Sequence, residues 1–165
     1  MKVTPINTVT SVTTTTRTTP SVTIKLDDPR AMPYRAHPTD AGADLFSNAK
    51  VALYPGESKL IDTGVAVKVP VSYVGLVYNR SSQGKIRVSI PHSVGVIDSD
   101  YRGNIKVLLV NNGEDPYFIE QYTTRIAQLV ITPVVLAEFH VFDPTITGLW
   151  DDTSRGTGGF GSTNL

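Results

Sequence analysis

From residue 21 onwards, apolar side chains fall in short runs that either alternate with polar side chains or consist of β-branched residues. In the segment Val65–Val69 valines recur at every second position, so they share one face of an extended strand. No stretch of helical length repeats apolar residues every 3.6 positions. The pattern indicates one all-β domain with at most a turn or two of helix. It predicts strands over Ser21–Leu26, Val51–Leu53, Lys59–Ile61, Val65–Val69, Val74–Tyr78, Ile86–Ile90, Ile105–Val110, Tyr117–Ile119, Arg125–Ile131 and Val134–Phe142.

Turn signals separate these runs at intervals of about one strand length. Examples are Pro55-Gly56, Asn112-Gly113 and Asp115-Pro116, which are residue pairs that favour tight turns. Such spacing is typical of a β-barrel or a β-sandwich. We expect this domain to cover residues 21–143.

Both ends of the chain differ in composition from the domain. Residues 1–20 contain nine threonines and hardly any large apolar side chain, which predicts a disordered arm. Beyond Pro144 the apolar content falls again. We expect residues 144–165 to form an arm that leaves the barrel, can reach a neighbouring subunit and ends in a glycine-rich lid.

Charge and composition narrow the function classes. The 165 residues carry 15 basic and 15 acidic side chains, so bulk electrostatic binding of DNA or RNA is not expected. No apolar run has membrane-spanning length and no charged-then-apolar leader opens the chain, which predicts a cytoplasmic protein without membrane contact. The absence of cysteine excludes disulfides, thiolate zinc sites and cysteine nucleophiles.

The last eleven residues place four glycines around Arg155, Phe160, Ser162 and Thr163. Glycine loses much conformational freedom on ordering, so this segment should order only when something docks under it. A phosphorylated base suits it, because the guanidinium and hydroxyls donate to phosphate and the ring offers a stacking face. The alternative is an ordinary frayed Gly/Ser terminus.

A second dense segment, Gly95–Gly103, contains two carboxylates, a phenol and a guanidinium between glycines that permit a tight hairpin. A carboxylate beside apolar residues can act as a base on water. The spacing of Asp98 and Asp100 also suits a divalent ion, although Mg²⁺ usually keeps several waters and takes few carboxylates. The alternative is an acidic β-turn with one exposed arginine.

Three further segments carry polar side chains. Asp44 follows a glycine turn, Arg80-Ser81-Ser82 offers a fork of donors suited to phosphate, and Gln128 interrupts an apolar strand. Each also has a structural interpretation: an Asx turn, a solvated turn and a core hydrogen bond.

Taken in order, the segments AGADLF, RSSQG, GVIDSDYRG, RIAQL and RGTGGFGST resemble the five motifs of the trimeric deoxyuridine triphosphatase (dUTPase) family. The resemblance covers about Asp40 to Thr163. It implies a distorted jelly-roll β-barrel homotrimer with a swapped C-terminal arm and active sites built from three chains. It also implies hydrolysis of dUTP to dUMP and pyrophosphate with Mg²⁺ bound by the triphosphate, which keeps uracil out of DNA and supplies dUMP for dTMP synthesis.

The resemblance also assigns roles to individual residues. Asp98 would be the general base that orients and deprotonates the attacking water, and Asp44 would lie near the metal and its waters. Tyr101 would lie under the deoxyribose and leave no room for a 2′-hydroxyl. Nucleoside contacts are expected from His92, Val96, Ile97, Tyr101, Lys106 and Phe160. Phosphate contacts are expected from Arg80, Ser81, Ser82, Gln128, Arg155, Ser162 and Thr163.

The chain departs from the common motif pattern in several places. Asn79 replaces a frequent proline, Ser82-Gln83 a frequent Gly-Leu, and Tyr122-Thr123-Thr124 the usual Gly-Asp. His92 stands near a position where many bacterial relatives carry asparagine, and it can equally be an exposed loop histidine.

Two other functions stay open at this point. A related dCTP deaminase would use a glutamate near the hairpin, and no glutamate occurs from Lys59 to Val110. A catalytically silent trimer that only senses nucleotides would not need a base at Asp98.

Overall fold

The computed structural model describes residues 19–143, 145, 150 and 153–158. Residues 1–18, which hold most of the threonine-rich arm, lie outside this part. The chain divides into two compact units, Met1–Val134 and Val135–Leu165. None of the helices in the described ranges is long or apolar enough to cross a membrane.

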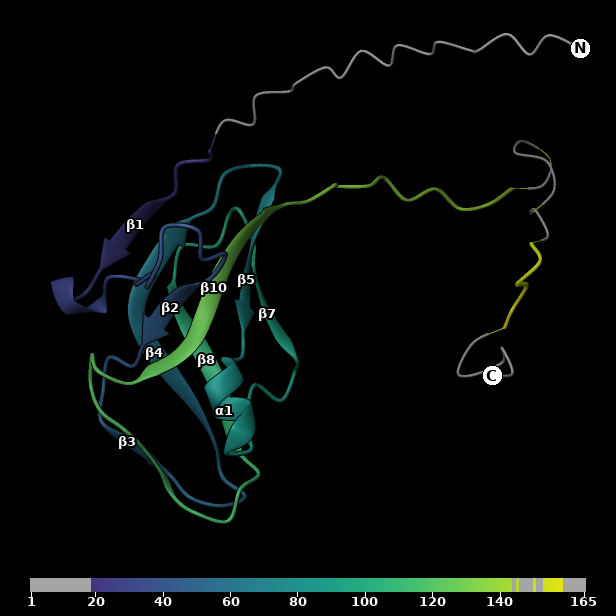
Figure 1. Ribbon diagram of the computed structural model, residues 1–165. Coiled ribbons are helices and arrows are strands. Elements are labelled where there is room, and N and C mark those ends of the chain that lie inside the picture. The colour runs from purple at the N-terminus through teal and green to yellow at the C-terminus, as the bar shows by residue number, and fades with distance from the viewer. Residues whose placement is uncertain (1–18, 144, 146–149, 151–152, 159–165) are drawn as a thin grey trace, which may run out of the picture. The chain divides into compact units, whose positions relative to one another are not determined.

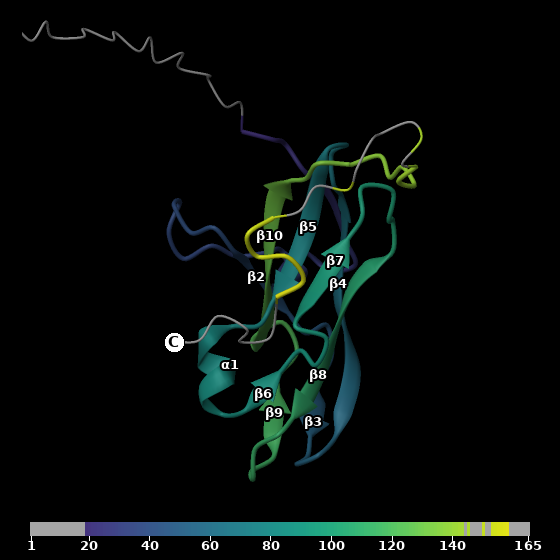
Figure 2. The same cartoon turned by 90° about the vertical axis from the view of Figure 1, so that its right-hand side faces the viewer.

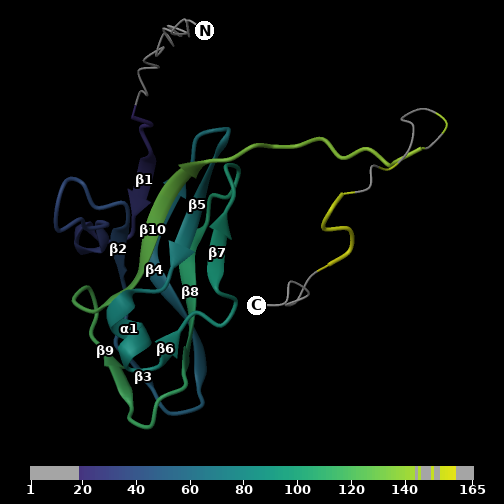
Figure 3. The ribbon, with the colours of Figure 1, turned by 45° about the vertical axis from the view of Figure 1, so that its right-hand side comes forward.

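The first unit consists of antiparallel strands in three sheets (Figure 1). The first sheet has the order β1 (Thr23–Leu26), β4 (Ser58–Lys68), β8 (Asn104–Asn111), β6 (Val88–Ser89). The second, which Figure 3 shows from β2 on the left to β7 on the right, has the order β2 (Ala43–Phe46), β10 (Arg125–Pro133), β5 (Tyr73–Tyr78), β7 (Val94–Ile97). A third pairs β3 (Val51–Leu53) with β9 (Tyr117–Ile119).

The core is formed by the inward faces of the two larger sheets. Val65 and Val67 of β4 are at most 2% exposed, as are Ile105 and Leu109 of β8. They belong to one cluster with side chains of the second sheet, including Ile126 of β10. The apolar faces that the period-2 pattern predicted are therefore buried in the core, and the predicted all-β fold is confirmed.

Two short helical elements occur in the first unit, a 3₁₀ turn over Pro29–Ala31 and α1 over Ser81–Lys85. Figure 2 shows α1 directly after β5, at the end toward which that strand runs. This agrees with the expected turn or two of helix. It also means that Arg80-Ser81-Ser82, the segment predicted to donate to phosphate, lies at the start of a helix and not in an open turn.

The strand predicted over Val134–Phe142 is wrong. β10 ends at Pro133, and no strand follows it up to residue 143. Val135, Phe139 and Val141 are 88%, 96% and 95% exposed. The run is rich in β-branched and aromatic residues, but a strand also needs a neighbour to satisfy its backbone groups. Correspondingly, the first compact unit ends at Val134, whereas the sequence pattern placed the end of the barrel at residue 143.

Two predicted runs, Lys59–Ile61 and Val65–Val69, form the single strand β4 apart from Val69 at its end. The run between them holds Gly64 at a φ of +68°, a conformation that favours glycine. The register against β8 shifts between Asp62 and Ala66. The strand therefore continues through a bulge where the apolar pattern was interrupted.

Candidate functional site

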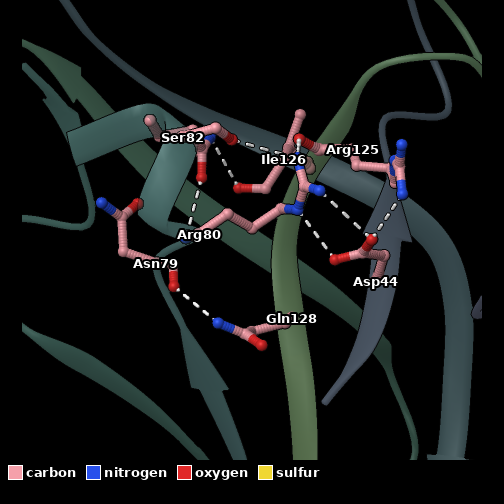
Figure 4. Close-up of polar contacts among 8 residues, drawn as sticks. Asp44, Asn79, Arg80, Ser82, Arg125, Ile126 and Gln128 are labelled. Carbon is pink, nitrogen blue, oxygen red and sulfur yellow. Dashed lines mark hydrogen bonds and ion pairs between the residues drawn. The ribbon is translucent and has the colours of Figure 1, made fainter. Parts of the chain in front are cut away.

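A carboxylate held between two guanidinium groups forms the centre of the candidate site (Figure 4). Nε of Arg80 donates to Oδ1 of Asp44 at 2.8 Å, and Nη1 of Arg125 donates to Oδ2 of Asp44 at 3.0 Å. The three side chains are 23%, 17% and 40% exposed in the order Arg80, Asp44, Arg125. Two cations around one anion leave a net positive charge, which suits an anionic ligand.

The strand order explains why these residues meet. β10 lies between β2 and β5, and Gln128 of β10 pairs with Asp44 on one side and Tyr78 on the other. Three of the sequence motifs therefore lie side by side at one end of this sheet. The register against β2 shifts between Arg125 and Ala127, so a β-bulge lies at the arginine that contacts Asp44.

Gln128 ties β10 to the residue before Arg80. Its Nε2 donates to the backbone oxygen of Asn79 at 2.9 Å, and Nδ2 of Asn79 donates to the backbone oxygen of Val88 at 3.1 Å. A Cβ on Gly42 would collide with Oε1 of Gln128. The glycine before Asp44 therefore makes room for this amide, and Gln128 makes a hydrogen bond of the kind that its structural interpretation required.

Ser81 and Ser82 are exposed residues of α1. Nη1 of Arg80 lies 3.4 Å from Oγ of Ser82 and 3.5 Å from the backbone oxygen of Arg125. The fork of donors that the sequence predicted is thus assembled next to the carboxylate of Asp44. Two contributors, Arg125 and Gln83, were not among the predicted site residues.

The sequence nevertheless contained a signal for both Arg125 and Gln83. Arg125 opens the apolar strand of the fourth motif, and Gln83 is one of the departures from the motif pattern. Gln83 is 2% exposed. Burial raises the pKa of the nearby Tyr117 hydroxyl, and a side-chain hydrogen bond with Gln83 and the charge of Arg80 partly offset this rise.

The sequence predicts a tight hairpin around Asp98; the segment connects β7 to β8, but these strands belong to different sheets, so it is a loop between sheets and not a hairpin. Asp98 is exposed, and its backbone oxygen accepts a hydrogen bond from the Tyr101 amide at 3.2 Å. The Tyr101 hydroxyl donates to the backbone oxygen of Asn104 at 3.0 Å. Its ring lies over Gly103, where an added Cβ would come within 2.8 Å of the ring carbon that bears the hydroxyl. These contacts hold the Tyr101 ring, which the family resemblance places under the deoxyribose.

Although β7 and β8 follow one another in the chain, the strand pairings of the described residues do not join them. β7 is the edge of the second sheet, whereas β8 pairs with β4 and β6. A cavity of about 220 Å³ is lined by residues of both strands, with Val96, Ile97 and Lys106 among them. His92 also lines it, and its ring Nδ1 lies 3.0 Å from the backbone oxygen of Val94. Four of the predicted nucleoside residues thus share one cavity, while Tyr101 does not line it.

The remaining predicted residues belong to the second unit. Nε of Arg155 donates to the backbone oxygen of Gly158 at 3.0 Å, within a turn in which Gly156 has a φ of +52°. Phe160, Ser162 and Thr163 lie outside the described residues. The structure therefore describes the local conformation of Arg155 and not the lid as a whole.

No group of three or more His, Cys, Asp or Glu side chains that could hold a metal ion occurs among the described residues. A magnesium ion bound mainly by phosphates and waters needs only one or two protein carboxylates. Oδ2 of Asp44 accepts from both arginines, whereas Oδ1 accepts only from Nε of Arg80 among the described side chains and keeps a second lone pair. Asp44 therefore fits the predicted contact with a metal-bound water.

Comparisons with known proteins agree with the motif pattern. Residues 28–164 match the family model described as dUTPase. The deoxyuridine 5′-triphosphate nucleotidohydrolase of Cutibacterium acnes is 48% identical over 139 residues, which are 83% of this chain and 88% of that protein. The one of Mycobacterium sp. (strain JLS) is 44% identical over 141 residues, 84% of this chain and 91% of that protein.

Solved structures with a similar fold include phage dUTPases. The Staphylococcus bacteriophage 80alpha dUTPase with dUpNHpp is 31% identical, with a TM-score of 0.74, and the match covers 89% of this chain and 100% of that chain. A dUTPase variant from phage phi11 of S. aureus, described with a structural Mg(II) ion, is 31% identical with a TM-score of 0.69, covering 75% of this chain and 97% of that chain.

Proposed function

This chain belongs to the dUTPase family, and we propose that it hydrolyses dUTP to dUMP and pyrophosphate at the site described above. The observation that carries the proposal is the arrangement of β7 and β8. These two strands belong to different sheets and line one cavity, and the turn that joins them carries Asp98. Backbone N–H and C=O groups need partners when they are covered, and the edge of a pyrimidine supplies both donors and acceptors.

Recognition of the deoxyuridine rests on these two strands. Main-chain groups around Val96, Ile97 and Lys106 bond the uracil edge, and His92 lines the same cavity. The hydrogen bond from the Tyr101 hydroxyl to the Asn104 oxygen holds the ring in place. A fixed ring under the deoxyribose rejects a ribose, because the extra 2′-hydroxyl would collide with it.

The chemical step is an attack of water on the α-phosphorus. The Asp98 carboxylate orients the water and accepts its proton as the new P–O bond forms. The bond from the α-phosphorus to the bridging oxygen breaks, and that oxygen leaves with pyrophosphate. Removal of the proton in the transition state is worth about two to four orders of magnitude in rate.

The charges around Asp44 stabilise the triphosphate. Arg80, Ser81, Ser82 and Gln128 provide donors to its oxygens, and preorganised donors of this kind supply much of the catalysis in phosphoryl transfer. Mg²⁺ bound by the triphosphate would supply charge neutralisation on the phosphates. Asp44 would hold a water of that ion through the lone pair that remains free on Oδ1.

The second unit closes the site of another subunit in a homotrimer. Phe160 stacks on uracil, while Arg155, Ser162 and Thr163 reach the phosphates and exclude water. The run of nearly fully exposed apolar side chains that includes Phe139 and Val141 supports a swapped arm, because another copy of the chain would cover it. In a bacterial or phage-infected cytoplasm this activity would limit uracil in DNA and supply dUMP.

The test is to incubate the protein with Mg²⁺ and, separately, dUTP, dCTP, dTTP and UTP, and to separate the products. Pyrophosphate and dUMP from dUTP alone are expected. Formation of dUTP or dUMP from dCTP would instead identify a deaminase, and binding of dUTP without turnover would identify a nucleotide sensor. Light scattering on the same sample is expected to give the mass of a trimer.

A further inference from the structure

Gln83 is a buried amide in the middle of the short helix α1. The described part of the chain contains four buried polar side chains, Ser47, Thr63, Gln83 and Asn111. Gln83 is the one among them that contacts the predicted phosphate loop. Burying an amide is unfavourable unless its donors and acceptor find partners, so the partners of Gln83 indicate what it does.

The first partner is Arg80. Oε1 of Gln83 accepts a hydrogen bond from the backbone amide of Arg80 at 3.1 Å. The backbone amide of Gln83 in turn donates to the backbone oxygen of Arg80 at 3.0 Å. Both backbone groups of Arg80 are therefore bound to Gln83. This reciprocal pair fixes the point from which the Arg80 side chain extends toward Asp44.

The second partner is the bulge in β10. Nε2 of Gln83 donates to the backbone oxygen of Ile126 at 3.0 Å, and Ile126 lies at the register shift between Arg125 and Ala127. A bulge interrupts the ladder and redirects a neighbouring side chain. Arg125, next to the bulge, is the side chain that reaches Asp44. The amide of Gln83 thus supports the bulge that directs the second arginine.

We propose that Gln83 is a positioning residue that sets the orientation of both Arg80 and Arg125 for the triphosphate. This inference rests on the proposed function, since it concerns the same phosphate site. Gln83 has this effect without touching the substrate, because it is buried and its polar atoms are bound to the backbone of Arg80 and Ile126 and to the Tyr117 hydroxyl.

An amide suits this position because it donates and accepts at once. Methionine has a similar length and neither function, so Gln83→Met leaves the Arg80 amide and the Ile126 oxygen without partners. Glutamate keeps the acceptor for the Arg80 amide, but a carboxylate would face the Ile126 oxygen with a second acceptor. The two variants therefore separate the contact with Arg80 from the contact with the bulge.

The chain offers a matched control in Asn111, which is 0% exposed. Its Nδ2 donates to the backbone oxygens of Leu53 and Asp115 at 2.9 Å each, and its Oδ1 accepts from the Gly113 amide at 2.9 Å. Like Gln83 it is a buried amide whose side chain binds backbone groups of residues in separate segments. None of those groups belongs to Arg80 or to the bulge, so Asn111→Leu reports the effect of lost stability alone.

The experiment measures Kd for dUpNHpp and for deoxyuridine by calorimetry, at a temperature where every variant is folded by circular dichroism. For Gln83→Met we expect dUpNHpp to bind about tenfold or more weakly, a loss that one or two misplaced charge-assisted hydrogen bonds would cause. Deoxyuridine, which lacks phosphates, is expected to bind as it does to the unmodified protein. Gln83→Glu is expected to give a smaller loss of dUpNHpp affinity.

Unchanged dUpNHpp affinity in both Gln83 variants would overturn the proposal, as would an equal loss in Asn111→Leu. If Gln83→Met does not fold, Gln83→Glu alone decides in the same way. The unmodified protein separates this inference from the proposed function: failure of that protein to bind dUpNHpp would overturn both, whereas tight binding that the variants retain would overturn the role of Gln83 only.

Discussion

Arg80 and Asp44 lie 36 positions apart in the chain and form a side-on ion pair, with Nε 2.8 Å from Oδ1 and Nη2 3.3 Å from Oδ2. The pair uses two donors of the planar guanidinium and fixes the plane of the remaining ones. Because the carboxylate also accepts from Arg125, Asp44 orients two cations with a single anion. The orientation of donors, more than their number, is what this site provides.

We expect Arg80→Lys to raise KM for dUTP about tenfold or more, because an ammonium group keeps the charge but loses the rigid fork. Steady-state kinetics at fixed ionic strength would measure this. Arg87→Lys is the control, since Arg87 is 69% exposed and its nearest carboxylate, on Glu114, is 4.0 Å away. Equal kinetic constants in the two variants would contradict the prediction.

Asp98→Asn is expected to lower kcat by about two orders of magnitude or more, because the amide cannot accept the proton of the attacking water. Binding of dUpNHpp and the trimeric mass are expected to stay as they are in the unmodified protein. Asp100→Asn in the same turn, also exposed, should retain most of the activity. Near-normal turnover of Asp98→Asn would remove the residue from its role as base.

Gly42→Ala is expected to lower the free energy of unfolding by about 1 kcal/mol and to raise KM for dUTP. The added Cβ would collide with Oε1 of Gln128, so the amide must turn away from the Asn79 oxygen. Urea unfolding and steady-state kinetics would measure the two effects.

Gly84→Ala provides the control, because a Cβ there meets no atom within 4 Å. Gly84 lies in α1, where alanine should stabilise by about 0.5–1 kcal/mol. The interpretation fails if both alanine variants change stability in the same direction.

The acid sensitivity of the protein should depend in part on Asp28. Hydrogen bonds from the Arg30 side chain and then from its backbone lower the pKa of Asp28 from 3.8 to about 2. Since the folded-state pKa lies below the unfolded value, the contribution is complete above the unfolded pKa and is lost as the pH falls toward the folded one. The ionised Asp28 therefore stabilises the fold near neutral pH.

Asp28→Asn tests this, because asparagine also caps helices well and can keep the hydrogen bond to the Arg30 amide. We expect the difference in free energy of unfolding between the two proteins to shrink as the pH is lowered from about 5 to about 2. Urea unfolding at a fixed protein concentration would show it. A difference that stays constant over this range would speak against the prediction.

Truncation after Ser154 is expected to leave a folded trimer with little dUTP hydrolysis, because it removes Arg155, Phe160, Ser162 and Thr163. Light scattering and product analysis would check both parts. Full activity of the truncated protein would show that these residues do not close the site.

The strand pattern was readable in advance wherever burial depends on alternation alone. Val65 and Val67 lie on the buried face that their spacing predicted. The run Val134–Phe142 shows the limit of this reasoning, because it is rich in β-branched and aromatic residues and yet forms no strand in the described part of the chain. Alternation specifies which face is apolar, whereas pairing needs another strand at the correct distance.

The motifs were equally readable, since each is a local run of residues, and the comparisons confirm the family that they indicated. The hydrogen bonds of Gln83 to Arg80 and Ile126, and the ion pair between Arg125 and Asp44, could not be read from the sequence. Gln83 and Ile126 are 43 positions apart, and Arg125 and Asp44 are 81 apart. Local order along the chain was enough to predict the fold class and the family, and to single out polar side chains as candidates for a site. Their partners follow from the placement of β10 between β2 and β5, because hydrogen bonds and ion pairs act over a few ångströms in space and not along the chain.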